Sequence, residues 1–159
     1  MTVFLGVVGH KKSGKTTLIE KLAANMKARG YTIGTIKITS HDLEFDSPGK
    51  DTYRHRQAGA AITLIKSQNS RALFTDSNYL DSHMIDAVFD KCQFVFIEGD
   101  NDLNRPCIYI ADQNPIRPDF KNRIVAVYGD DVRLPSIPNF GIDNLNGLCE
   151  FIIERFGKA

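Results

Sequence analysis

The sequence predicts an α/β protein of three layers, in which a mainly parallel β-sheet is flanked by helices. Three observations lead to this class. A glycine-containing pattern occupies residues 9–17, a short apolar run precedes it, and a segment with helical spacing of apolar residues follows it. Apolar runs then alternate with helical segments to the end of the 159 residues, so we expect one domain spanning residues 1–159.

The glycine-containing pattern reads Gly-His-Lys-Lys-Ser-Gly-Lys-Thr-Thr and matches the phosphate-binding loop G-x-x-x-x-G-K-[ST] at every fixed position. Its glycines let backbone N–H groups turn toward phosphate oxygens, Lys15 can reach the β- and γ-phosphates, and the Thr16 hydroxyl suits Mg²⁺. The apolar run over 3–8 and the helical pattern over 16–29 supply the strand–loop–helix setting that the pattern requires. We therefore expect a P-loop NTPase fold whose nucleotide is bound by Gly9, His10, Lys11, Lys12, Ser13, Gly14, Lys15, Thr16 and Thr17.

The segments that follow predict further elements in turn. Residues 31–38 are an expected strand that completes a β-α-β unit with a right-handed crossover. After a polar loop over 39–51, a short helix is expected over 52–58, because Asp51 can cap it and Gly59 can end it. Apolar spacing predicts later strands at 60–65, 71–74, 94–97, 107–111 and 123–128, and helices at 78–89 and 144–156.

Two acidic residues are candidates for the magnesium and γ-phosphate side of the site. Glu98 directly follows the apolar run 94–97, so its carboxylate is expected at the carboxyl edge of the sheet, beside the phosphate loop. Asp42 lies in the polar loop that leaves another strand end. We expect Lys15, Glu98 and Asp42 to act in hydrolysis, and Thr16, Asp42 and Glu98 to hold Mg²⁺.

The residues that read the nucleobase are less well specified. Asp130 and Asp131 follow a late strand, where guanine-specific NTPases place an aspartate that accepts hydrogen bonds from guanine N1 and N2. The usual Asn-Lys-x-Asp signature is absent, so both acids are base-reading candidates, and Asp130 is the one we assign to the nucleotide site. Asp100 and the loop residues His41 and Asp46 are further candidates for the metal side.

Composition and charge exclude several classes. Lys and Arg total 20 and Asp and Glu total 19, so a strongly electrostatic nucleic-acid binder is not expected. No apolar run reaches the length of a membrane-spanning helix, and three widely separated cysteines suggest neither a disulfide framework nor a zinc site. We therefore expect a cytoplasmic protein with reduced thiols and with neither membrane nor nucleic acid as a partner.

Several stretches outside the phosphate loop are more selective than the loop itself. They are Asp46-x-Pro48-Gly49-Lys50-Asp51-Thr52-Tyr53-Arg54, Ala58-Gly59-Ala60, His41-Asp42 and Glu98-Gly99. Together with the loop they resemble the molybdopterin-guanine dinucleotide biosynthesis protein B (MobB) family, most strongly over residues 1–66. The resemblance implies a dimeric protein that binds GTP with Mg²⁺ and hydrolyses it weakly. It also implies work beside the molybdenum cofactor guanylyltransferase, which attaches GMP to molybdopterin.

Two places depart from that family's pattern, and two other functions stay open. Ile38 and Ser40 stand where histidines are usual, and Asp100 and Asn101 stand where an aromatic residue and a lysine are usual. Neither change touches triphosphate binding. A P-loop small-molecule kinase would need an arginine-bearing lid, for which residues 111–123 are the available segment. A nucleotide-gated metallocentre chaperone would use GTP to order the polar loop after the second strand.

Overall fold

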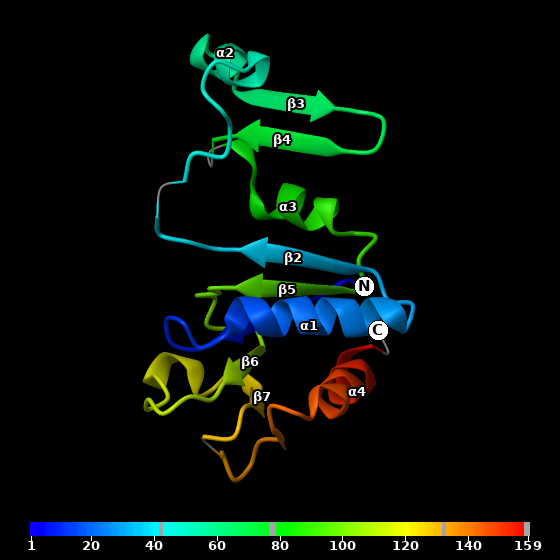
Figure 1. The fold of residues 1–159 in the computed structure, drawn as a ribbon, viewed down its shortest axis with the longest axis vertical. Coiled ribbons are helices and arrows are strands. Elements are labelled where there is room, and N and C mark those ends of the chain that lie inside the picture. The colour runs from blue at the N-terminus through cyan, green and yellow to red at the C-terminus, as the bar shows by residue number, and fades with distance from the viewer. Residues whose placement is uncertain (42, 77–78, 132, 158–159) are drawn as a thin grey trace. The chain divides into compact units, whose positions relative to one another are not determined.

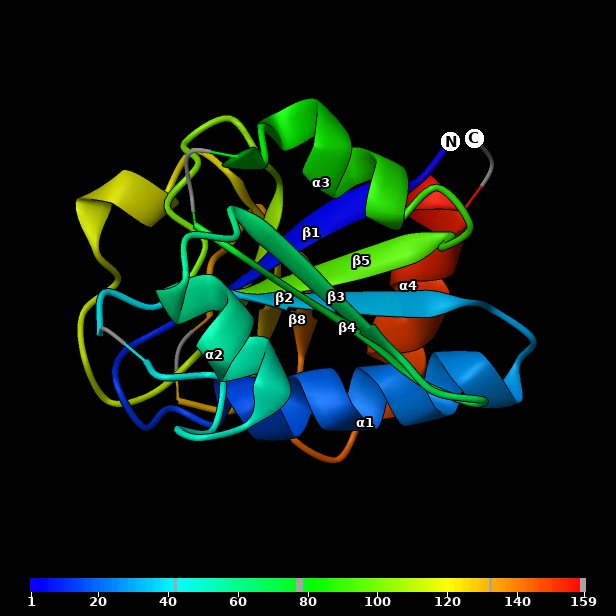
Figure 2. The same ribbon diagram turned by 90° about the horizontal axis from the view of Figure 1, so that it is seen from above.

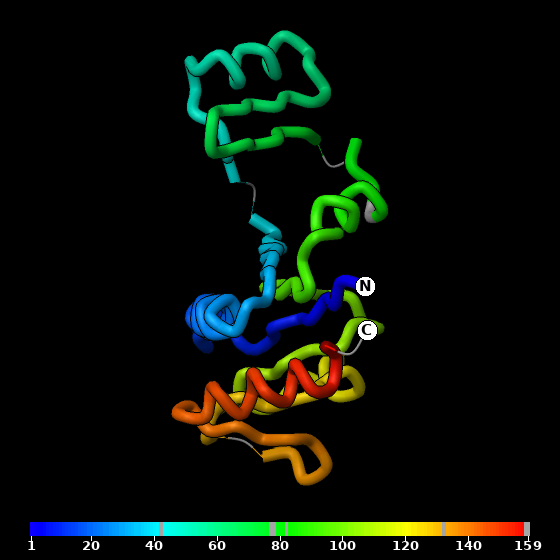
Figure 3. Tube along the Cα trace, turned by 90° about the vertical axis from the view of Figure 1, so that its right-hand side faces the viewer, coloured from blue at the N-terminus to red at the C-terminus, as the bar shows by residue number. Residues whose placement is uncertain are grey.

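The structure, a computed structural model, describes residues 1–41, 43–76, 79–131 and 133–157. The chain forms two compact units (Figure 1). Unit 1 comprises Met1–Thr39 and the chain from Phe89 onward, and unit 2 comprises Ser40–Val88. The chain thus leaves unit 1 after Thr39, forms unit 2, and re-enters unit 1 at Phe89 (Figure 3). The phosphate loop lies in unit 1, and the expectation of one nucleotide-binding domain over the whole chain stays a prediction.

Unit 1 is built on a six-stranded sheet in which every paired strand runs parallel to its neighbour. Figure 1 shows this for β2 and β5, whose arrows point the same way. The strand order is β2-β5-β1-β6-β7-β8. This sheet confirms the predicted α/β class, although β8 was not predicted because two residues carry no periodic pattern. The strands are β1 (Val3–Val8), β2 (Ile33–Lys37), β5 (Phe94–Glu98), β6 (Cys107–Ile110), β7 (Ile124–Tyr128) and β8 (Asn139–Phe140).

Helices α1 (Lys15–Ala28) and α4 (Leu145–Phe156) cover one face of this sheet (Figure 2). Their buried leucines and isoleucines pack against alternate residues of the central strands, such as Leu5 and Phe96. The opposite face packs around β6 and β7 against the 3-10 helix η2 (Pro118–Phe120). Because the central strands are buried on both faces, their sequences are nearly continuous apolar runs rather than alternating patterns.

The parallel register brings the ends of three strands to one edge of the sheet. Along β1 and β5, Val7 lies opposite Glu98, and along β2 and β5, Lys37 lies opposite the same Glu98. The phosphate loop leaves β1 one residue after Val7, at Val8. Polar residues that follow distant apolar runs in the sequence therefore become neighbours at the carboxyl edge.

Unit 2 contains α2 (Asp51–Gln57), the antiparallel strands β3 (Ile62–Lys66) and β4 (Arg71–Thr75), and α3 (Ser82–Val88). Strands β3 and β4 were predicted, but they form a two-stranded sheet of their own rather than extending the parallel sheet. The helix predicted at 78–89 is shorter than expected. Its expected apolar face is also exposed, since Met84 and Val88 have exposed fractions of 47% and 68%.

Two helix caps differ from the sequence-based expectation. Asp51 is the first residue of α2, and Lys50 takes the cap position in an extended conformation. At α4 the cap is Asn144, whose side chain accepts a hydrogen bond from the Gly147 N–H at 3.1 Å, and not Asp143. Both shifts are of one residue, and at α4 the reason is that Asn and Asp are nearly equal as N-cap residues.

Candidate nucleotide site

Residues 9–14 curl between β1 and α1 at the carboxyl edge of the sheet. The φ angle is positive at Gly9 (155°), Lys12 (67°) and Gly14 (93°). A Cβ atom on Gly9 would lie 2.7 Å from Ser13 Oγ, so the loop is too tight there for a side chain. Gly14 is the N-cap of α1 and caps it with no side chain. The first N–H groups of α1 are therefore directed at the position that a phosphate would take.

The Lys15 ammonium lies inside this loop. Its Nζ donates to the carbonyl oxygens of Gly9 at 3.1 Å and of His10 at 2.5 Å. Burial lowers the pKa of Lys15; the charges of Glu98 and Asp112 oppose that shift, and Lys37 adds to it. Charge-assisted bonds to phosphate are stronger than bonds to neutral carbonyls, so an ammonium at this position could exchange these carbonyls for a polyphosphate.

Thr16 and Glu98 meet where the start of α1 faces the end of β5. Thr16 Oγ1 donates to the Glu98 carboxylate, at 3.0 Å from Oε1 and 2.9 Å from Oε2. A hydroxyl next to a carboxylate, beside a phosphate loop, is the set of hard oxygen donors that Mg²⁺ takes in nucleotide sites. Among the described residues, no group of three His, Cys, Asp or Glu side chains could hold a metal alone. A metal here would therefore depend on phosphate and water oxygens as well.

A hollow of about 470 Å³ opens beside the loop, on the side of β6 and β7. Its size is in the range of small-ligand pockets. One wall is fixed, because Tyr128 Oη donates to the Ile142 carbonyl at 2.6 Å and Asp130 Oδ2 accepts from the Ile142 N–H at 3.4 Å. The hollow is lined by Lys12, Ser13, Gly14, Thr17, Leu18, Lys21, Ile110, Ala111, Asp112, Tyr128, Gly129, Asp130, Asp131 and Ile142.

Most of the predicted site residues lie together in unit 1. The loop from Gly9 to Thr17 borders both the Glu98 carboxylate and the hollow that contains Asp130. Lys11 is exposed at the loop's tip. His10 Nε2 lies 3.0 Å from the Pro115 carbonyl oxygen, which ties the loop to the segment after β6. The functional roles that we assigned to these residues stay predictions.

Other candidates are engaged elsewhere, or fall outside the described chain. Asp42, expected near the metal, lies outside the described residues. Asp46 is buried in unit 2, where Oδ1 accepts from the Ser47 N–H and from Thr52 Oγ1, both at 3.0 Å. Asp100 is buried in unit 1 and forms an ion pair with Arg123. The carboxylates of Asp46 and Asp100 therefore hold their own loops in place.

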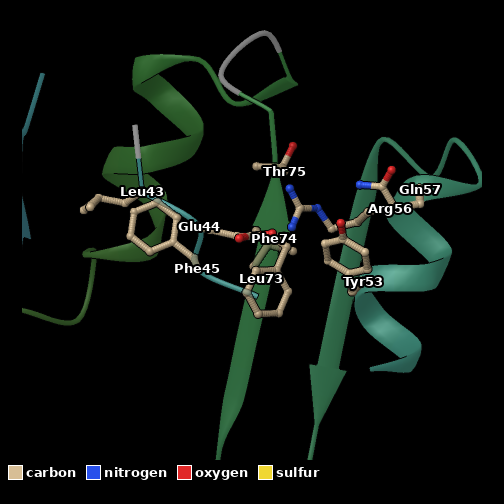
Figure 4. A pocket seen from close by; sticks show the side chains of 9 residues that line it. All are labelled: Leu43, Glu44, Phe45, Tyr53, Arg56, Gln57, Leu73, Phe74 and Thr75. Carbon is tan, nitrogen blue, oxygen red and sulfur yellow. The ribbon is translucent and has the colours of Figure 1, made fainter. Parts of the chain in front are cut away.

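Unit 2 has a hollow of its own, of about 700 Å³, between α2, β4 and the segment before α2 (Figure 4). The Arg56 guanidinium lies over the Phe74 ring, 5.7 Å from its centroid, and 3.8 Å from Asp46 Oδ2. These contacts hold α2 against the hairpin. The hollow is lined by Leu43, Glu44, Phe45, Tyr53, Arg56, Gln57, Leu73, Phe74 and Thr75.

Sequence reasoning missed two charged residues at the edge of the parallel sheet. Lys37 Nζ lies 3.6 Å from Glu98 Oε1, and Asp112 lines the hollow beside the loop and acts on Lys15. Both follow the last apolar residues of a strand, as Glu98 does. That shared position is the signal that would have found them.

The parallel sheet, the loop from Gly9 to Thr17 between its central strand and α1, and the contact between Thr16 and Glu98 define the class. The protein is an α/β protein of the P-loop NTPase fold. None of the described helices is long and apolar enough to cross a membrane.

The family described as "Molybdopterin guanine dinucleotide synthesis protein B" (MobB) matches residues 4–130, and the chain belongs to this family. It is 32% identical to the molybdopterin-guanine dinucleotide biosynthesis adapter protein of Escherichia coli K12, over 99% of this chain and 95% of that protein. It is 41% identical to a putative adapter protein of the same name from Methanocaldococcus jannaschii, over 98% of this chain and 70% of that protein.

Two solved structures share the fold. Bacillus subtilis MobB superposes with a TM-score of 0.75 at 21% identity, covering 99% of both chains. A MobB homologue from Bacillus stearothermophilus gives a TM-score of 0.68 at 20% identity, covering all of both chains. The predicted family and fold class are thereby confirmed.

Proposed function

We propose that this MobB-family chain binds GTP with Mg²⁺, hydrolyses it slowly, and serves as an adapter in the formation of molybdopterin guanine dinucleotide. The observation that carries the nucleotide part is the convergence of Lys15, Thr16 and Glu98 at the phosphate loop. The adapter part is supported by the names of the Escherichia coli and Methanocaldococcus jannaschii relatives. As partners we propose the molybdenum cofactor guanylyltransferase, molybdopterin and a second copy of this chain.

Triphosphate binding would use the backbone N–H groups of residues 11–16 and the Lys15 ammonium. Lys15 would release the Gly9 and His10 carbonyls and donate instead to β- and γ-phosphate oxygens. The Thr16 hydroxyl would ligate Mg²⁺ directly, and Glu98 would hold it through a water molecule. Bound there, Mg²⁺ would offset the negative charge of the phosphate groups. Thr17, which lines the hollow beside the loop, would contact the α-phosphate.

Hydrolysis would need a water molecule oriented at the γ-phosphorus, and the Glu98 carboxylate is the described group placed for it. The water oxygen bonds to the γ-phosphorus, the bond from that phosphorus to the bridging oxygen breaks, and GDP and phosphate are released. Asp42 remains the second proposed residue for this role.

A kinase-type lid finds little support in the structure. Arg117 forms an ion pair with Asp119 at 2.6 Å, and Arg123 is buried against Asp100. Arg117 thus pairs within its own segment, and Arg123 is held by the loop after β5. Without an arginine free to reach the γ-phosphate from this segment, hydrolysis is expected to be slow.

Guanine would occupy the hollow beside the loop, with Asp130 as the reader of its edge. The Asp130 carboxylate lines this hollow together with the Thr17 side of the loop. A carboxylate accepts hydrogen bonds from guanine N1 and N2, whereas adenine offers no matching pair of donors. This pairing is the physical basis for a preference for GTP over ATP.

Calorimetric titration with GTP and with ATP, each with Mg²⁺, tests the proposal. The wild-type chain is expected to prefer GTP. Lys15→Ala is expected to weaken GTP binding about 100-fold while the circular dichroism spectrum stays unchanged. A wild-type chain without affinity for GTP, or a Lys15→Ala variant that binds as tightly, would refute the nucleotide site. For the adapter role, the chain is expected to capture purified guanylyltransferase in a pull-down, and no capture either with or without nucleotide would refute that role.

A further inference from the structure

Lys37, the last residue of β2, places a second ammonium group beside Glu98, at the edge of the proposed nucleotide site. It lies opposite Glu98 in the β2–β5 register, and its Nζ is 3.6 Å from Glu98 Oε1. The same carboxylate accepts a hydrogen bond from the Thr16 hydroxyl, with 2.9 Å between Thr16 Oγ1 and Glu98 Oε2. One carboxylate thus joins a strand-end lysine to the residue that we propose as the metal ligand.

Nucleotide binding would change the balance of charge among Lys15, Lys37 and Glu98. Lys15 and Lys37 are close enough for the charge of Lys37 to lower the pKa of Lys15, while Glu98 acts in the opposite sense. A metal held between Thr16 and Glu98 would compete with Lys37 for the charge of the Glu98 carboxylate and so weaken this ion pair. The incoming γ-phosphate would supply Lys37 with a new anionic partner.

The Lys37 side chain is placed to make that exchange. It is 62% exposed, whereas the Glu98 side chain is 16% exposed. The pair is long, at 3.6 Å, and its lysine end is exposed to solvent, so it is weak and a charge-assisted bond to phosphate can replace it. The lysine stem is flexible, while its Cα is held by the paired strand β2.

We infer that Lys37 contacts the γ-phosphate and stabilises the charge that develops as this group is transferred to water. It is a catalytic residue that takes, in this chain, the role that other P-loop NTPases give to an arginine. In the GDP-bound and nucleotide-free states it returns to Glu98. The inference rests on the proposed nucleotide site and deepens it, because it makes Lys37 the group that distinguishes GTP from GDP.

The test compares Lys37→Ala and Lys37→Arg with a matched control, Lys91→Ala. Lys91 is an exposed lysine in the turn before β5, at the opposite end of the sheet from Glu98. The measurements are calorimetric affinities for a non-hydrolysable GTP analogue and for GDP, both with Mg²⁺, and single-turnover GTP hydrolysis. Lys37→Ala should bind the GTP analogue about 10- to 100-fold more weakly and bind GDP as the wild type does. Lys37→Arg should recover part of the loss, and Lys91→Ala should match the wild type.

Each other outcome has a distinct meaning. If Lys37→Ala weakens GTP-analogue and GDP binding equally, or weakens neither, Lys37 is only a partner of Glu98 and the inference is wrong. If the wild-type chain binds neither nucleotide, the proposed nucleotide site fails and the inference fails with it. Melting temperatures of all three variants identify any loss of folding, which is not expected for a side chain as exposed as Lys37.

Discussion

The Thr16 hydroxyl donates to both carboxylate oxygens of Glu98, at 3.0 and 2.9 Å, across 82 positions of sequence. This contact joins the first turn of α1 to the carboxyl end of β5. It exists because β1 and β5 are paired in parallel with Val7 opposite Glu98, so the loop after β1 and the acid after β5 reach the same edge. The contact keeps the oxygen donors of both residues together before any ligand arrives.

Replacing Glu98 by glutamine removes the charge and keeps the shape. The amide oxygen can still accept from Thr16, so folding should be unaffected. Glu98→Gln should lower GTP hydrolysis about 100-fold, because a neutral amide accepts weaker hydrogen bonds than a carboxylate from the waters that would hold Mg²⁺ and attack the γ-phosphate. Single-turnover hydrolysis with Mg²⁺ is the measurement.

Glu150→Gln is the control for this change. Glu150 is an exposed acid of α4 that lies 3.6 Å from Arg29, outside the site. The Glu150→Gln variant should hydrolyse GTP at the wild-type rate. Equal rates in the wild type and Glu98→Gln would remove Glu98 from the mechanism.

Asp130→Asn should change the preferred base. An amide presents a donor where the carboxylate accepted, and xanthine carries a carbonyl at C2 where guanine carries an amino group. The variant is therefore expected to lose about 10- to 100-fold in GTP affinity and to gain affinity for xanthosine triphosphate. Competition binding with both nucleotides measures the switch. Should Asp131→Asn produce the switch instead, Asp131 is the base reader and the assignment of Asp130 is wrong.

A buried ion-pair network holds the turn after β5. Asp100 and Arg123 are 1% and 5% exposed. Asp100 Oδ2 accepts from Arg123 Nη1 at 3.2 Å, and Oδ1 accepts from Arg105 Nη1 at 2.8 Å. Arg123 Nη2 also donates to the Asp100 carbonyl oxygen at 2.6 Å, so the arginine holds both the side chain and the backbone of this residue.

Asp100→Asn should lower the free energy of unfolding by about 3 to 5 kcal/mol, because it leaves a buried guanidinium without its carboxylate. Asp119→Asn is the matched change in an exposed pair with Arg117. It should cost far less, although the distance in that pair, 2.6 Å, is the shorter one. Urea unfolding of both variants measures whether the burial of an ion pair or its short distance decides how much the pair contributes to the free energy of unfolding. Similar losses in the two variants would contradict the buried network.

Because the Cys107 thiol is buried, we expect the free energy of unfolding to fall at alkaline pH. Burial raises its pKa from 9.0 to about 12, with Arg123 acting against the shift and Asp100 adding to it. Above pH 9 the unfolded chain releases this proton while the folded chain keeps it. The contribution of the protonated thiol to the free energy of unfolding is therefore fully present below pH 9 and is lost as the pH rises toward 12.

Urea unfolding of the wild type and Cys107→Ala at about pH 8 and about pH 10.5 measures this effect. The variant is less stable at the lower pH, because it leaves a small cavity. Between the two pH values the wild type should lose about 2 kcal/mol more than the variant. Parallel losses would mean that the thiol ionises in the folded protein as it does in the unfolded chain.

The sequence by itself determined the phosphate loop and its immediate setting. Gly9, Gly14, Lys15 and Thr16 lie within one short stretch, and the conformation they need follows from local backbone geometry. The buried strand that ends at Glu98 was predictable for a similar reason, since its apolar run continues without a break.

Only the tertiary structure decided which distant residues meet. It placed Lys37 opposite Glu98, buried Asp100 against Arg123, and gave β3 and β4 a sheet of their own. Each outcome depends on the pairing register between segments far apart in the chain, which no local pattern specifies. Because a parallel sheet brings its strand ends to one edge, single polar residues that look unremarkable in sequence become a charged cluster there.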